Sequence, residues 1–150
     1  MKIIHLPLIV AATACAVMFV RSPRVAQTLG VQSIEITYQP MPPPIQGGES
    51  ARLAAGNAAT AGSLYVFRVH LIKGGLVPPH THTDTRYETV LSGTLYVCLT
   101  DTVAADKVRA FPAGSFFIMP AGTVHCSWAK DGDVTYDEAG IAPTTTTYLH

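Results

Sequence analysis

Charged residues are scarce in this chain of 150 residues, where they make up 13% of the sequence and hydrophobic residues make up 48%. The ten basic residues balance the ten acidic ones and are scattered, so the chain lacks the basic cluster that nucleic-acid binding requires. Heptad repeats, a glycine-rich phosphate loop and a Gly-x-Ser-x-Gly motif are also missing from the sequence. Length and apolar content together predict one globular domain with a sizeable core.

The sequence has no apolar run of the length expected for a membrane span, which is roughly 18 residues or more. Its longest run covers residues 6–20 and follows the basic Lys2, a layout typical of a secretory signal. We therefore assign residues 1–26 to a signal peptide or N-terminal anchor and expect a periplasmic or secreted protein. The alternative is that residues 6–20 remain as an uncleaved anchor, which would be the only contact with a membrane.

Cysteines are few: there are three, and Cys15 falls within the N-terminal segment. Cys98 and Cys126 remain, and an oxidising compartment would allow them to pair. Alternation along the expected strands gives Cys98 an inward and Cys126 an outward position. The sequence therefore predicts no disulfide between them.

Helical periodicity is absent, and short runs of β-branched and aromatic residues stand between glycine, proline and aspartate clusters. The expected strands are residues 63–72, 87–100, 114–120, 125–129, 133–141 and 144–149, with a turn at Ser92-Gly93. Residues 40–49 contain four prolines and predict an extended arm on the surface, and residues 54–63 predict a loop. This pattern indicates an all-β sandwich or closed barrel.

Three histidines are candidate metal ligands. Alternate residues of a strand share one face, so His80 and His82 in the segment PPHTH can bind one ion together. His125 follows the turn in PAGTVH at the start of a strand and can complete a site that leaves positions open for water or substrate. Such ligands suit a divalent transition metal, with Zn, Fe, Mn and Ni as the candidates, and the spacing does not select among them.

These segments resemble the two motifs of the cupin superfamily. Positions of the first motif, G-x5-H-x-H-x3,4-E-x6-G, are matched by Gly74, His80, His82 and Gly93, and positions of the second, G-x5-P-x-G-x2-H-x3-N, by Gly114, Pro120, Gly122 and His125. The sequence is most similar to small exported bacterial cupins with a single, type-2-like domain. The resemblance implies one antiparallel jelly-roll barrel over residues 33–149, a bound metal, a small-molecule ligand and a homodimer formed through strand edges.

The match fails at two motif positions. The glutamate of the first motif falls on Arg86, and the terminal asparagine of the second falls on Ala129. The loss of the glutamate matters more, because the resemblance implies that it is the only anionic metal ligand. Glu88 has the same strand parity as Arg86 and lies about 6.5 to 7 Å further along the strand.

Three arrangements of this region are compatible with the sequence. In the first, Glu88 replaces the missing ligand and Arg86 turns toward the barrel mouth to bind an anionic substrate. In the second, the three histidines hold the metal alone, as in the thiol dioxygenase branch of the cupins. In the third, Arg86 and Glu88 form an ion pair in an interior without metal, because a guanidinium stays charged and must be paired when buried.

Four further residues have weaker signals. Tyr96 and Ser127 share the parity of the histidines, so each either lines the cavity, with Tyr96 binding substrate, or packs in the core. Trp128 has the opposite parity and is expected to pack between sheets or subunits, and His70 is expected to be solvated.

Two classes of function are compatible with this candidate site. The first is a metal-dependent enzyme, oxygenase-like or isomerase-like, acting on a small molecule. The second is a non-catalytic domain that binds or senses a small ligand or a metal through a degenerate site. A weaker third reading is a degenerate cupin kept for assembly alone.

Overall fold

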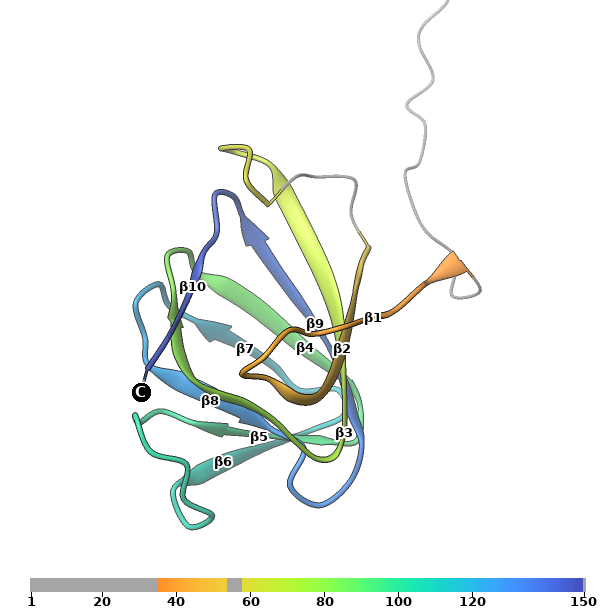
Figure 1. Ribbon diagram of the computed structural model, residues 1–150, viewed down its shortest axis with the longest axis vertical. Helices are drawn as coiled ribbons and strands as arrows, with labels where there is room; N and C mark the ends of the chain where they lie inside the picture. The colour runs from red at the N-terminus through yellow and green to blue at the C-terminus, as the bar shows by residue number, and fades with distance from the viewer. Residues whose placement is uncertain (1–34, 54–57, 150) are drawn as a thin grey trace, which may run out of the picture.

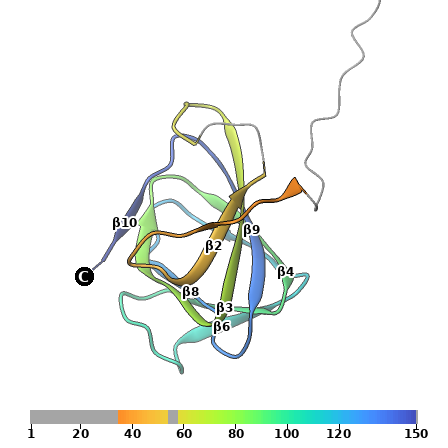
Figure 2. The ribbon, with the colours of Figure 1, turned by 45° about the vertical axis from the view of Figure 1, so that its right-hand side comes forward.

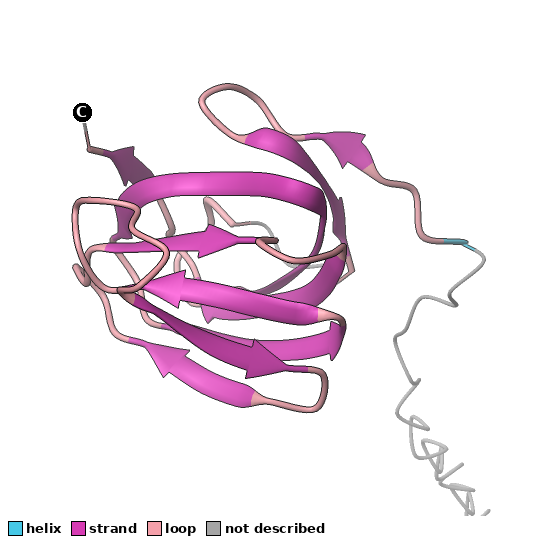
Figure 3. Ribbon diagram, turned by 90° about the horizontal axis from the view of Figure 1, so that it is seen from below, coloured by secondary structure: helices cyan, strands magenta, loops and turns pink. Residues whose placement is uncertain are grey.

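A computed structural model describes residues 35–53 and 58–149 of the chain. This described part contains ten strands and no α-helix, which confirms the all-β prediction. The short segment drawn as helix in Figure 3 is a single 3₁₀ residue, Glu35. The strands are β1 Gln39–Pro40, β2 Gln46–Arg52, β3 Leu64–His82, β4 Arg86–Ser92, β5 Thr94–Cys98, β6 Val108–Pro112, β7 Phe116–Met119, β8 His125–Trp128, β9 Val134–Ile141 and β10 Thr146–Tyr148. The predicted signal or anchor, residues 1–26, lies outside the described residues. A search of the described residues for a helix capable of spanning a membrane finds none.

The strands form a single antiparallel barrel that is nearly closed (Figures 1 and 2). Neighbouring strands follow the order β6, β5, β8, β3, β9, β4, β7, and β2 and β10 also pair with β3. The two ends of this order, β6 and β7, meet through the stacked rings of Phe111 and Phe117, whose centroids are 4.2 Å apart. The jelly-roll architecture predicted from the sequence is therefore confirmed.

The longest strand, β3, carries two of the candidate ligands. The sequence predicted a strand that ended at residue 72, whereas β3 has 19 residues and continues to His82. Gly74, with φ of +84°, bends the chain there without ending the strand, since glycine adopts positive φ at little cost. The first part of β3 pairs with β2 and β9, and its last part pairs with β8 and β10.

The prediction that residues 40–49 form an extended arm on the surface is only partly correct. Its prolines precede β2, so they do not interrupt the hydrogen bonds by which β2 pairs with β3. Met41 and Ile45, on either side of the prolines, pack against the core. Strand β6 was not predicted, and of the predicted loop at residues 54–63 only residues 58–63 are described.

The barrel interior is filled by inward residues from five strands and by Ala129, directly after β8. The core cluster consists of Val69, Leu71, Val77, Val90, Leu95, Val97, Met119, Ala129, Val134 and Tyr136. In β4 the inward positions have even numbers, whereas in β5 the inward positions are Leu95 and Val97, which belong to the core cluster. A register shift between Val90 and Ser92, followed by the turn, changes the parity.

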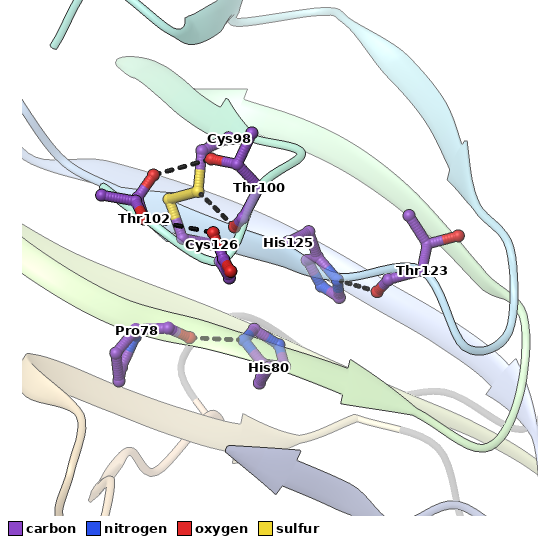
Figure 4. Close-up of a disulfide and its surroundings, with 9 residues drawn as sticks. Pro78, His80, Cys98, Thr100, Thr102, Thr123, His125 and Cys126 are labelled. Carbon is purple, nitrogen blue, oxygen red and sulfur yellow. Dashed lines mark hydrogen bonds between the residues drawn. A yellow bond between two sulfur atoms is a disulfide. The ribbon is translucent and has the colours of Figure 1, made fainter. Parts of the chain in front are cut away.

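This change of parity overturns the prediction about the cysteines. Cys98 lies opposite Cys126 on the paired strands β5 and β8, so both side chains point to the same face. They form a disulfide, and both residues are fully buried beside Thr100 and Thr102 (Figure 4). Parity counted from β4 through the turn had placed Cys98 on the wrong face.

Candidate metal centre

His80, His82 and His125 come together inside the barrel. His80 and His82 end β3, and His125 begins β8 directly opposite His80. All three residues are buried, and one ligand nitrogen of each lies within 4.8 Å of the others. The Nε2 atoms of His80 and His82 are 3.0 Å apart. Two nitrogens that each lie about 2.0 to 2.1 Å from one ion can be separated by such a distance.

Two of the three imidazoles are oriented by backbone carbonyls. The Nδ1 of His80 donates to the Pro78 carbonyl at 2.7 Å, and the Nδ1 of His125 donates to the Thr123 carbonyl at 2.9 Å (Figure 4). In each case the acceptor lies two residues earlier in the chain. A neutral ring with its proton on Nδ1 has a lone pair on Nε2, so both rings are prepared to bind a metal.

The environment keeps these rings neutral. Burial lowers the pKa of His80 to about 4, with a further contribution from His125. Burial, followed by the charge of Arg86, lowers the pKa of His82 to about 2. Burial also lowers the pKa of His125. Neutral imidazoles are the form that binds metal, so this donor set fits a divalent transition metal.

Arg86 takes the place of the glutamate ligand in the cupin motif and is itself buried. Its guanidinium forms a hydrogen-bonded ion pair with Glu138 and donates to the Thr144 hydroxyl at 3.0 Å. Its Nη2 is also 3.1 Å from Nδ1 of His82. The structure thus pairs Arg86 with Glu138, and the ion pair with Glu88 that the third arrangement required is not found among the described residues.

Glu88 points into the barrel, as its parity predicted, and is 2% exposed. It does not belong to the group of close ligand atoms formed by the three histidines. Its Oε2 has no hydrogen-bond partner among the described residues. Burial, with the nearby Glu138, raises the pKa of Glu88 well above its usual value. The arrangement that this geometry supports is therefore the one with three histidine ligands.

Tyr96 and Ser127 lie on different faces, although strand alternation predicted the same face for both. Ser127 is opposite Val97 and is buried inside the barrel. Tyr96 is opposite Trp128 on the other face, and its hydroxyl donates to Asp131 at 2.5 Å. The structure does not bring Tyr96 to the histidines.

His70 is only partly exposed and contacts a carboxylate. Its Nδ1 is 3.0 Å from Oε1 of Glu49, so it is less free than the sequence suggested. It lies outside the group formed by the three candidate ligands.

The contacts made by β10 were not predicted from the sequence. Thr146 lies opposite His82, and its hydroxyl is 3.1 Å from Nδ1 of that ring. Tyr148 lies opposite His80, with ring centroids 5.6 Å apart. The segment TTTT does not specify a register by itself, because a shift of one residue puts another threonine at the same place.

Comparison with known proteins agrees with this architecture. The family model described as Cupin matches residues 47–136, more than half of the chain. The chain belongs to the cupin family. This cupin is 34% identical over 74 residues to germin-like protein 3-1 of Oryza sativa subsp. japonica. That match covers 49% of the chain and only 33% of the rice protein.

Solved structures with the same fold are more distant in sequence. The polyketide cyclase RemF from Streptomyces resistomycificus aligns with a TM-score of 0.65 and 15% identity, over 83% of this cupin and 88% of RemF. The oxalate decarboxylase of Bacillus subtilis, a protein with Mn(II) centres, aligns with a TM-score of 0.58 and 13% identity, over 79% of this cupin and 30% of the decarboxylase. At these identities the likeness shows the fold alone.

Proposed function

We propose that this cupin binds a divalent transition metal through His80, His82 and His125 and that the metal acts on a small molecule in the barrel. The observation that carries the proposal is the set of three buried, neutral imidazoles with ligand nitrogens within 4.8 Å of one another. Imidazole ligands suit Zn, Fe and Ni, and Mn(II) occurs in the structurally similar oxalate decarboxylase, so we propose the class and not the element.

A bound ion of this kind supplies Lewis acidity, or oxygen activation if it is redox-active, at a position left open by three protein ligands. Pro78 and Thr123 hold the Nδ1 protons of His80 and His125 and so fix the direction of both lone pairs. The burial of the histidines limits access of water. Three neutral ligands do not balance the charge of a divalent ion, which favours a small molecule that carries an anionic oxygen.

A pocket of about 360 Å³ supports a ligand with an apolar body. Its lining includes the inward residues Val97 and Met119, the exposed Phe116 and Ile118, and Thr123, whose carbonyl orients His125. None of the three histidines lines it, so the pocket lies beside the candidate metal centre. Pockets of this size and composition accommodate small organic molecules.

One observation favours a second candidate, a non-catalytic domain that senses or stores a ligand. Arg86 contacts the ring of His82, and a nearby positive charge opposes the binding of a cation. A weak, exchangeable metal site would suit sensing better than turnover.

Cobalt binding tests the proposal, because Co(II) has visible absorption bands that report its coordination. We expect the purified protein to bind one equivalent, and each of His80→Ala, His82→Ala and His125→Ala to lose most of the affinity. His70→Ala is the matched control, because this histidine is also partly buried and lies outside the group. If all four variants bind cobalt as the wild type does, the histidines are not the ligands.

We also propose that the protein is exported. The basic and apolar segment at residues 1–20 supports this, and so does the pairing of Cys98 with Cys126, because disulfides persist in oxidising compartments. Residues 1–30 fused to a reporter that is active only outside the cytoplasm should give a signal. A silent fusion, with the full-length protein in the cytoplasm, would refute export.

Finally, we propose a homodimer. Exposed apolar side chains gather on the outer face of the adjacent strands β3, β9, β4 and β7. They are Leu64, Tyr87, Phe116, Ile118 and Ile141, each 44–59% exposed. A contiguous apolar patch of this kind marks an interaction surface, and a second copy of the same face would cover it.

A further inference from the structure

The hydrogen bonds around His82 determine which of its nitrogens carries the proton. The Pro78 carbonyl can only accept, so His80 carries its proton on Nδ1 and presents a lone pair at Nε2. The Nε2 of His82, 3.0 Å from that lone pair, must then be the donor. A neutral ring has one N–H group, so Nδ1 of His82 is an acceptor.

Arg86 completes this chain of hydrogen bonds from the other side. A guanidinium offers only donors, and its Nη2 lies 3.1 Å from Nδ1 of His82. Every proton therefore has an assigned place: Arg86 donates to His82, His82 donates to His80, and His80 donates to Pro78. The directions agree at each link.

This proton arrangement conflicts with metal binding at one ring only. His80 and His125 present lone pairs on Nε2, but His82 presents an N–H group toward the centre of the group. To bind through Nε2, His82 must move its proton to Nδ1, where it would face the donor group of Arg86. An N–H group that faces another N–H group forms no hydrogen bond.

The structure offers an alternative acceptor for that proton. The hydroxyl of Thr146 is 3.1 Å from Nδ1 of His82 and can accept from it. The Thr145 carbonyl also favours a proton on His82. Arg86, if it leaves His82, keeps its hydrogen bonds to Glu138 and Thr144.

We infer that Arg86 holds His82 in the tautomer that cannot bind a metal through Nε2, and that Thr146 is the residue that positions the metal-binding tautomer. This inference rests on the proposed metal function. Binding then proceeds with an exchange of partners at Nδ1 of His82, in which Thr146 replaces Arg86. Arg86 lowers metal affinity through this contact as well as through its charge.

Nitrogen NMR of the metal-free protein tests the inference directly. Long-range proton–nitrogen spectra distinguish the two tautomers, and comparison with His82→Gln assigns the His82 signals. We expect His82 to be protonated on Nε2 and both His80 and His125 on Nδ1. A His82 protonated on Nδ1 in the metal-free wild type would overturn the inference without any variant.

Cobalt titrations test the roles of the two partners. Thr146→Val removes the side-chain acceptor and should weaken Co(II) binding about tenfold, as loss of a partner behind a metal ligand does. Thr147→Val is the matched control, because Thr147 is equally exposed and lies opposite Thr81 instead of His82. Equal affinities for these two variants would overturn the role of Thr146.

A double variant removes the arginine without leaving its partner charged. Arg86→Met with Glu138→Gln should shift His82 to the Nδ1 tautomer in the metal-free protein and strengthen Co(II) binding about tenfold or more. Glu138→Gln alone is the control, since it keeps Arg86. An unchanged tautomer and unchanged affinity in the double variant would overturn the inference. Absence of cobalt binding in every variant would overturn the proposed function, and with it the inferred exchange at His82.

Discussion

Glu88 and Glu138 lie directly opposite each other on the paired strands β4 and β9, and only Glu138 is paired with Arg86. One guanidinium cannot compensate both the buried Glu88 and the partly buried Glu138, and Tyr136, a further titratable group nearby, brings no positive charge. Burial and the charge of Glu138 therefore raise the pKa of Glu88 well above its usual value. In the folded protein Glu88 holds a proton under conditions in which an unfolded chain has lost it.

The first prediction follows from this difference. A raised pKa in the folded state contributes stability that is complete below the unfolded pKa and is lost as the pH rises toward the folded pKa. We expect the wild type to lose stability as the pH rises above about 4.5, and Glu88→Gln to remove part of this dependence. The variant should be more stable than the wild type by about 1 to 3 kcal/mol at pH 8, because glutamine has no carboxyl group to ionise in this buried site beside Glu138.

Urea unfolding at pH 4 and pH 8 measures this difference. Thr89→Ser, at the neighbouring position whose side chain points to the other face, is a control that should show the dependence of the wild type. A Glu88→Gln variant less stable than the wild type at pH 8 would show that the ionised carboxylate is needed. Loss of metal together with that result would make Glu88 a ligand after all.

The second prediction concerns the disulfide between Cys98 and Cys126. The two residues are 28 positions apart, and closing a loop of that length stabilises a protein by roughly 3 to 4 kcal/mol in the chain-entropy model. Cys98→Ala with Cys126→Ala should lose about this much, as measured by urea unfolding. The oxidised Cys15→Ala variant is the control, and its free energy of unfolding should equal that of the wild type. If a reductant leaves the free energy of unfolding of this variant unchanged, the prediction is contradicted.

The sequence predicted the cluster of three candidate ligands better than it predicted the residues around them. The spacing of His80, His82 and His125 was sufficient, because strand alternation and a turn before a strand fix where such side chains point. The jelly-roll barrel and the strand that begins at His125 follow the prediction, whereas His80 and His82 lie in a strand that was predicted to end at residue 72. The inward position of Glu88 was also predicted correctly.

The partners of Arg86 depend on strand neighbours, which a single sequence does not specify. Glu138 has inward parity in its own strand, but only the pairing of β9 with β4 brings it to Arg86. Thr146 reaches His82 through the pairing of β10 with β3. The error at Cys98 has a related cause, since parity is lost where a strand shifts register before a turn.

The third prediction tests the homodimer. Ile118 lies on the exposed apolar face, opposite Tyr87, and is 52% exposed. Ile118→Glu places a charge there and should convert a dimer to a monomer at micromolar concentration, as measured by light scattering. Ile72→Glu is the control, because Ile72 is 53% exposed on β3 and lies outside this group. A monomeric wild type would remove the proposal.

The fourth prediction concerns Gly140, which lies opposite Tyr65 on the paired strands β9 and β3. A Cβ atom at this position would collide with the hydroxyl of Tyr65 and with Oδ2 of Asp84, two groups that are hydrogen-bonded to each other. Burial, with the bond to Asp84, raises the pKa of Tyr65 to about 12, so the hydroxyl remains a donor. Asp84 also accepts from Thr144, which in turn accepts from Arg86.

Gly140→Ala should therefore destabilise the protein by about 1 to 3 kcal/mol, the usual penalty for forcing an extra carbon into a packed site. Thermal unfolding would show this as a fall in Tm of several degrees. Gly132→Ala is the matched control, because no atom lies within 4 Å of the added carbon, and its effect should stay within about 0.5 kcal/mol. If both variants unfold with the wild type, the contact between Tyr65 and Asp84 is looser than the structure indicates. Arg86 would then be held mainly by Glu138.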